Sequence, residues 1–172
     1  MSESAAPPPE DPPEPGSRRD LPPYTPAQER ALKLGARVMS ALNRWVFQAS
    51  GGRVGNRFMH GAPVCLLTTR GARSARLRTT PLIYLAEGDD VVLVASQGGA
   101  STSPHWYYNL LAHPDDVEVQ VGSQRRKMRA RRASAQEKAA LWPKLCAIYP
   151  DYEDYQARTE RDIPVMILSP RA

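Results

Sequence analysis

The strongest constraint on the fold is a series of short strand-like runs between residues 64 and 168. The run at 91–96 is almost wholly apolar and is typical of a central strand, whereas 117–121 alternates between apolar and polar residues, as a half-buried strand does. Helical patterns interrupt these runs irregularly, so the order favours an α+β barrel or sheet over a doubly wound fold. The predicted strands are 64–69, 78–85, 91–96, 117–121, 125–132 and 163–168.

The helical patterns carry recognisable start signals. Thr25 followed by Pro26 is an N-cap and first-turn pair, and the residues after it repeat an apolar position every three or four residues. Ser134 and Glu137 form a capping box. The predicted helices are 26–49, 104–112, 134–149 with a kink at Pro143, and a short piece capped by Asp151.

Composition divides the chain into two parts. More than half of the 17 prolines precede residue 27, and this stretch has almost no large apolar side chain. Such a sequence buries too little surface to offset its ordering entropy. We therefore predict a disordered Pro-rich tail over residues 1–24 and a single domain over 25–172, for which an apolar fraction of 41% is sufficient.

Several classes of protein are not indicated. The tail lacks the apolar core of a signal peptide, and no run of about 18 apolar residues predicts a membrane span. Cys65 and Cys146 lie inside apolar runs and are interpreted as buried thiols of a reducing compartment. No Cys or His pair has metal-ligand spacing. We expect a cytoplasmic protein without a metal.

Two arginine-rich segments account for much of the net charge of +5. Residues 53–78 hold six arginines and 125–132 hold six basic residues, with no acid in either segment. A solvated surface, an anion site and a nucleic-acid site are the three interpretations. No helix-turn-helix, zinc or aromatic RNA-binding signature accompanies the charge, so we expect no nucleic-acid partner.

Three motifs combine charge with flexible or aromatic residues. Thr68–Leu82 is an arginine-rich turn between two apolar runs, Val94–Gly99 is a strand that ends in Gly-Gly, and Pro104–Asn109 opens an aromatic helix. Guanidinium groups bind phosphate and carboxylate through forked hydrogen bonds, and glycine lets a ring approach the backbone. The combination suits a flat, anionic, phosphate-bearing ligand.

With a fourth segment, Ile148–Gln156, the order and spacing of these motifs resemble the deazaflavin-dependent nitroreductases and quinone reductases of actinobacteria. The resemblance implies a split β-barrel of the flavin-reductase type, with about six strands, an N-terminal helix and flanking helices. It implies an oxidoreductase that transfers hydride from reduced coenzyme F420 to a quinone-like or nitroaromatic acceptor. Hydride chemistry then belongs to the coenzyme, and the protein orients donor and acceptor.

The resemblance assigns Arg73, Ser74 and Arg78 to the phosphate and acidic tail of coenzyme F420, with Arg76 as a further contact. The chain departs from the family pattern here, because Ala75 stands where a glycine is usual. If that position has a positive φ, alanine costs about 1 kcal/mol or shifts the turn.

For the coenzyme ring, the resemblance assigns residues of three segments. Trp106 has a second interpretation as a plain core residue. Ile83 is expected to face away from Tyr84, which has the character of a core residue. The expected ring contacts are Ile83, Ser96, Gln97, Gly98, His105, Trp106, Asn109 and Tyr152.

Three tyrosines near the C-terminus recur every third residue. A tyrosine hydroxyl donates a hydrogen bond while its ring forms an apolar wall. By resemblance, Tyr152 contacts substrate or ring, with Tyr149 and Tyr155 beside it; surface packing is the alternative for each.

Two further alternatives concern function and partners. One is a non-catalytic protein that binds deazaflavin or a hydrophobic small molecule, in keeping with the unusual Gln97 and His105. The other is peripheral contact of the basic helix, through Arg30 to Arg44, with the inner face of the membrane. The sequence does not specify the oligomeric state.

Overall fold

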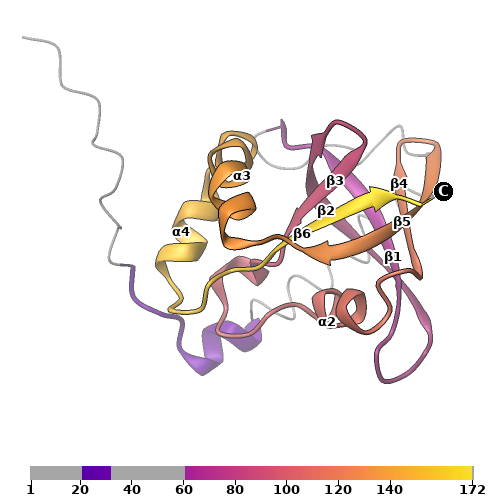
Figure 1. Cartoon of the computed structure of the whole chain (residues 1–172). Coiled ribbons are helices and arrows are strands. Elements are labelled where there is room, and N and C mark those ends of the chain that lie inside the picture. Colours follow the sequence, from indigo (N-terminus) through magenta and orange to yellow (C-terminus); the bar gives the residue numbers. More distant parts are fainter. Residues whose placement is uncertain (1–20, 32–60, 172) are drawn as a thin grey trace, which may run out of the picture.

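A computed structural model describes residues 21–31 and 61–171 of the chain. Six antiparallel strands close into a barrel in the order β1-β2-β3-β6-β5-β4 (Figure 1). Each of the six predicted strands is confirmed, and the barrel with its flanking helices confirms the α+β class. The strands are β1 (Val64–Arg70), β2 (Leu77–Glu87), β3 (Asp90–Val94), β4 (Val117–Val121), β5 (Gln124–Arg132) and β6 (Val165–Pro170).

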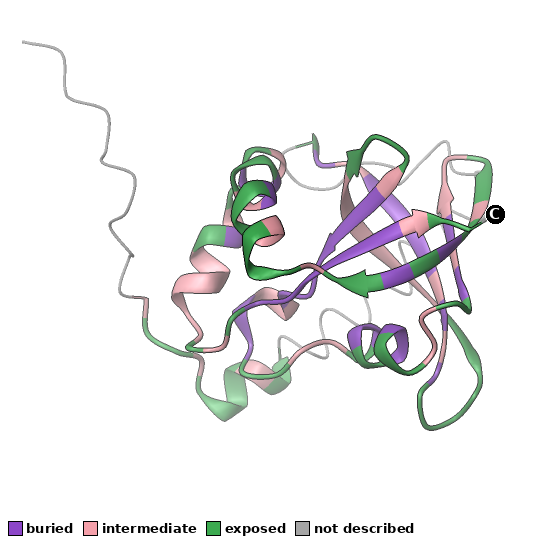
Figure 2. Cartoon of the chain, viewed as in Figure 1, coloured by how far each residue is buried: buried purple, intermediate pink, exposed green. Residues whose placement is uncertain are grey.

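The barrel interior is filled by alternate residues of every strand (Figure 2). Val117 and Val119 point into it from β4, which confirms the predicted alternation. Tyr84 packs against the same cluster, whereas its neighbour Ile83 packs against a second cluster outside the barrel. The predicted opposition of Ile83 and Tyr84 is therefore correct.

Helices cover two sides of the barrel. Helix α2 (His105–Ala112) contributes buried side chains to the interior cluster, while α3 (Ala135–Ile148) and α4 (Asp151–Ala157) build the second cluster on the outer face of β3 and β6 (Figure 1). This arrangement explains the apolar run of β3. Val91 and Leu93 face the interior, and Val92 and Val94 face the outer cluster.

Local capping agrees with the sequence except at one helix. Ser134 and Glu137 form the predicted capping box. Asp151 is the first residue of α4 and not its cap, because Pro150 occupies the N-cap position and no side chain caps the helix. The last strand starts at Val165 and not at residue 163, and the carbonyl of the preceding Pro164 accepts the Ala95 N–H at 2.9 Å.

Residues 26–31 are helical, and Thr25 and Gln28 cap each other, so the predicted helix start is confirmed. The rest of the predicted helix 26–49, like residues 1–20 of the predicted tail, lies outside the described residues. No helix in the described part of the chain is long and apolar enough to cross a membrane. Cys65 and Cys146 are buried free thiols, and burial raises the pKa of Cys146 to about 11.

Candidate functional site: an arginine turn, a glycine loop and a tyrosine wall

The arginine turn, residues 70–78, consists of the loop 71–76 that joins β1 to β2 and of the strand ends on either side of it. The Gly71 N–H donates to the Arg76 carbonyl at 2.9 Å, and the Ala75 N–H donates to the Gly71 carbonyl at 2.8 Å. A Cβ on Gly71 would lie 2.5 Å from the Ser74 hydroxyl oxygen, so the turn is folded tightly over a residue without a side chain. A side chain at 71 would require the Ser74 hydroxyl to move and would crowd the Arg76 carbonyl, which lies 3.3 Å from the Cβ position.

Ala75 adopts a left-handed backbone with φ of 54°. The condition that the sequence left open, a positive φ at this position, is met in the structure. Alanine is strained in this region because its Cβ approaches the carbonyl oxygen, whereas glycine is not. The turn keeps its hydrogen bonds despite that strain, so the alanine lowers stability without unfolding the turn.

Asn109 anchors the turn to helix α2. Its Oδ1 accepts the Ala72 N–H at 2.9 Å, and its Nδ2 donates to the Thr69 hydroxyl oxygen at 3.1 Å. The side chain is buried, so each of these groups would be costly to leave unpaired. Arg70 adds a second anchor, because it donates to the Ala75 carbonyl at 2.9 Å and pairs with Asp116.

The other arginines of the turn are exposed. Among the described residues, Arg73, Arg76 and Arg78 have neither an ion pair nor a hydrogen-bond acceptor. The backbone N–H groups of Arg73 and Ser74 likewise lack an acceptor in the described structure. The turn thus presents cationic side chains and backbone N–H donors to an anion from outside the chain.

The glycine loop follows β3 and contains the short 3-10 helix η2 (Gln97–Gly99). Ser96 is buried, and Gln97 and Gly98 are partly buried. Gln97, Gly98 and Gly99 all have positive φ angles. A Cβ on Gly99 would lie 2.8 Å from the Tyr155 carbonyl oxygen, so the glycine permits direct contact between this loop and α4.

The tyrosine wall is formed by Tyr149, Tyr152 and Tyr155, whose ring centroids lie 5.1 to 6.3 Å apart. The hydroxyl oxygens of Tyr149 and Tyr155 are 3.1 Å apart. Burial raises the pKa of both Tyr149 and Tyr152, so these phenols remain protonated donors at neutral pH. Ile83 packs against the same cluster.

Helix α2 lies between these features. Asn109 contacts the arginine turn, while His105 begins the helix a few residues after the glycine loop and is exposed. Eight residues of α-helix span about 12 Å. Trp106 is buried with the barrel core, as its second interpretation stated.

Sequence reasoning missed Arg161. This side chain donates to the carbonyls of Ser96 and Ala100 in the glycine loop at 2.7 and 2.8 Å. The partners are more than 60 positions away along the chain, and no local pattern marks such a contact. Glu29 of the N-terminal segment also reaches this loop and accepts the Ser101 N–H at 2.9 Å.

Solved structures share the fold of this barrel. A solved structure of an F420-H2-dependent reductase, FDR-A, matches with a TM-score of 0.58 and 38% identity, covering 62% of this chain and 94% of that one. A second solved structure, described as a domain-swapped dimer, has a TM-score of 0.60 at 31% identity and covers 83% of this chain and 99% of its own. The first match confirms the predicted barrel type.

Sequence comparison agrees with the structural one. Rv3178 of Mycobacterium tuberculosis is 42% identical over 119 residues, which cover 69% of this chain and 99% of that protein. The F420H(2)-dependent quinone reductase Rv1261c of the same species is 40% identical over 129 residues, which cover 73% of this chain and 86% of that protein. The family model for the F420H(2)-dependent quinone reductases matches residues 39–170, and this chain belongs to that family.

Proposed function

We propose that this protein is an F420H2-dependent reductase that passes a hydride from reduced coenzyme F420 to a quinone-type acceptor. The observation that best supports this proposal is the arginine turn, where three exposed guanidinium groups lack an acidic partner among the described residues. The names of the family and of relatives at 40–42% identity support the same activity. Nitroaromatic compounds are a second acceptor class that we propose for the same site.

The residues of the turn fit an acidic coenzyme tail. Coenzyme F420 carries a phosphodiester and several glutamates, whereas flavin mononucleotide carries one phosphate. Arg73, Arg78 and the Ser74 hydroxyl would hold the charged part, with Arg76 beside them. Several charge-assisted hydrogen bonds are available there, which favours a polyanion over a single phosphate.

The glycine loop and the start of α2 would hold the deazaflavin ring. Ser96, Gln97 and Gly98 supply polar groups and open backbone, and His105 lies exposed at the start of the helix. Ile83 packs in the cluster that contains the tyrosine wall. When bound, coenzyme F420 supplies the hydride, so the chain needs no acid–base dyad of its own.

The tyrosine wall would orient the acceptor. A quinone oxygen becomes negative as hydride arrives, and a nearby O–H donor stabilises that charge. Tyr149 and Tyr155 share a hydrogen bond between their hydroxyls, and Tyr149 also hydrogen-bonds with Asp151, so this pair would be held in a fixed orientation beside the acceptor. Tyr152 packs against both rings and is itself buried, so it would support the wall from behind.

Fluorescence titration with long-tailed, short-tailed and tail-less deazaflavin tests the coenzyme assignment. Affinity should fall in that order, and added salt should weaken the long-tailed form most, because exposed charges are screened. Equal binding of all three forms would contradict the role of the turn.

Turnover tests the activity. Absorbance should report reoxidation of F420H2 by a quinone, with a nitroaromatic as the second acceptor, and no turnover should occur with a nicotinamide or with flavin mononucleotide. Robust turnover with a nicotinamide alone contradicts the proposal. Tight binding of the coenzyme without oxidation by any acceptor would instead identify a non-catalytic binding protein.

Cytoplasmic location and peripheral membrane contact stay predictions. The basic positions concerned run from Arg30 to Arg44, and all of them except Arg30 lie outside the described residues. Flotation of the full chain with anionic liposomes should be lost on Arg37→Glu with Arg44→Glu if the contact exists.

A further inference from the structure

The segment from Ser96 to Ser103 connects β3 to α2 through an unusual backbone. Gln97, Gly98 and Gly99 have φ angles of 48°, 66° and 79°. A left-handed backbone is unfavourable for a residue with a side chain, so Gln97 is strained. The segment makes few internal hydrogen bonds, with Gly99 N–H to Ser96 O at 3.0 Å as the shorter of the two. Its shape therefore requires support from outside.

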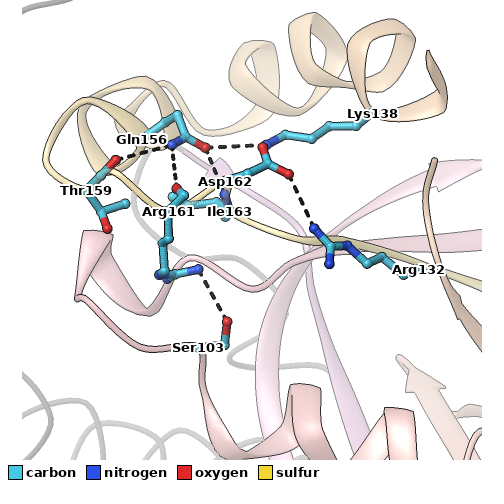
Figure 3. A network of polar contacts seen from close by, with 8 residues as sticks. All are labelled: Ser103, Arg132, Lys138, Gln156, Thr159, Arg161, Asp162 and Ile163. Carbon is cyan, nitrogen blue, oxygen red and sulfur yellow. Dashed lines mark hydrogen bonds and ion pairs between the residues drawn. The ribbon is translucent and has the colours of Figure 1, made fainter. Parts of the chain in front are cut away.

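Arg161 supplies that support. Its Nη2 donates to the Ser96 carbonyl at 2.7 Å and to the Ala95 carbonyl at 3.2 Å, and its Nε donates to the Ala100 carbonyl at 2.8 Å. Its Nη1 reaches the Ser103 hydroxyl at 3.3 Å, as Figure 3 shows. A single planar guanidinium thus spans the segment from its start to its end.

The neighbouring carboxylate, that of Asp162, does not form an ion pair with Arg161. The adjacent carboxylate of Asp162 pairs with Arg132 and Lys138, not with Arg161 (Figure 3). Gln156 of α4 fixes the Arg161 backbone by donating to its carbonyl at 2.9 Å. Asp162 and Glu29 attract the charge of Arg161, but within the described residues neither forms an ion pair with it, so its N–H donors go to loop oxygens.

We propose that Arg161 is a positioning residue for the coenzyme: it holds the Ser96–Ser103 segment in the shape that receives the deazaflavin ring. The proposal rests on the function proposed above. Lysine offers a point charge on a flexible stem and lacks the forked geometry that reaches several carbonyls at once. Charge alone is therefore not enough, and shape is the property that Arg161 contributes.

The test compares Arg161→Gln and Arg161→Lys with Arg132→Gln, which removes a nearby guanidinium that pairs with Asp162 and does not touch the loop. Fluorescence titration should show coenzyme F420 binding about 10-fold weaker in Arg161→Gln. Arg161→Lys should recover only part of the loss, and Arg132→Gln should bind like the wild type. The KM for F420H2 should rise about as much, with a smaller change in the KM for the quinone.

Hydrogen–deuterium exchange of the coenzyme-free protein gives a readout that is independent of activity. Amides of residues 97–103 should exchange faster in Arg161→Gln, while those of β1 and α3 keep wild-type rates. Wild-type exchange in the loop, or wild-type affinity, in a folded Arg161→Gln protein overturns the proposal. Global loss of protection in that variant overturns it too, because Arg161 would then be a general stability residue. Failure of the wild type to bind the coenzyme refutes the proposed function instead.

Discussion

The arginine turn and strand β5 carry similar densities of arginine but differ in their surroundings. On β5, four of the six basic residues have a carboxylate partner within the described structure. On the turn, Arg70 alone has one among the described residues. The β5 pairs are Arg125–Glu118, Arg129–Asp115, Arg131–Glu137 and Arg132–Asp162.

This difference shows that an arginine-rich segment of the sequence does not by itself provide charge that a ligand can use, because nearby carboxylates can neutralise it. The acids that face β5 come from β4, from the loop before it, from α3 and from the loop before β6. Exposed pairs of this kind add little stability but neutralise the surface. A polyanion is therefore expected at the turn and not along β5, which also argues against a continuous nucleic-acid surface.

The largest expected effect comes from removing two charges at each place. Arg73→Gln with Arg78→Gln should weaken binding of long-tailed coenzyme F420 by about 100-fold, because each charge-assisted hydrogen bond contributes about 1.5–3 kcal/mol. Arg125→Gln with Arg129→Gln lowers the net charge equally and should change affinity by less than about 3-fold. Fluorescence titration measures both. Equal losses of affinity in the two double variants would contradict the contrast between the turn and β5, and would indicate that the coenzyme is attracted to the overall positive charge of the protein.

Asn109, which anchors the turn to α2, should contribute to the stability of the protein as well as to coenzyme binding. Asn109→Ala leaves the Ala72 N–H and the Thr69 hydroxyl without their partner and should lower the free energy of unfolding by about 2–3 kcal/mol. Urea denaturation measures this loss, and titration should show weaker coenzyme binding. Leu111→Ala, at an exposed position of the same helix, is the matched control. A stable Asn109→Ala protein with full affinity would show that the turn holds its shape unaided.

A smaller effect is expected at the strained alanine. Ala75→Gly should raise the free energy of unfolding by up to about 1 kcal/mol, because glycine relieves the strain of a φ of 54°. Ala72→Gly in the same turn, where φ is not positive, should have no such benefit. Destabilisation by Ala75→Gly would mean that unfolded-state entropy outweighs the strain.

The smallest effect concerns a single pair of β5. Hydrogen bonds from Arg131, and then from the Ser134 N–H, lower the pKa of Glu137 from 4.5 to about 2. Since the folded pKa is the lower one, the stabilisation is present above pH 4.5 and is lost as the pH falls toward 2. Wild type should therefore exceed Glu137→Gln in denaturation midpoint at neutral pH, with a gap that closes in that window. A gap that does not vary with pH would assign the loss to the helix cap instead of the charge.

Much of the barrel was predictable because strand periodicity is a local property. The apolar run of β3 and the alternation of β4 indicated how each strand is buried, and the capping box marked the start of α3 correctly. The cap of α4 was wrong because proline takes the position before Asp151. For the site, the motifs identified the turn, the glycine loop and the tyrosines as segments, and the role of each residue stays a prediction.

The sequence by itself determined the strand pattern and the family, since each depends on neighbouring residues or on motif order. Only the tertiary structure decided which arginines are neutralised, that Asn109 holds the turn, and that Arg161 supports the glycine loop. The physical reason is that hydrogen bonds and ion pairs depend on distances of a few ångströms. Barrel closure creates those distances between segments that the sequence keeps far apart.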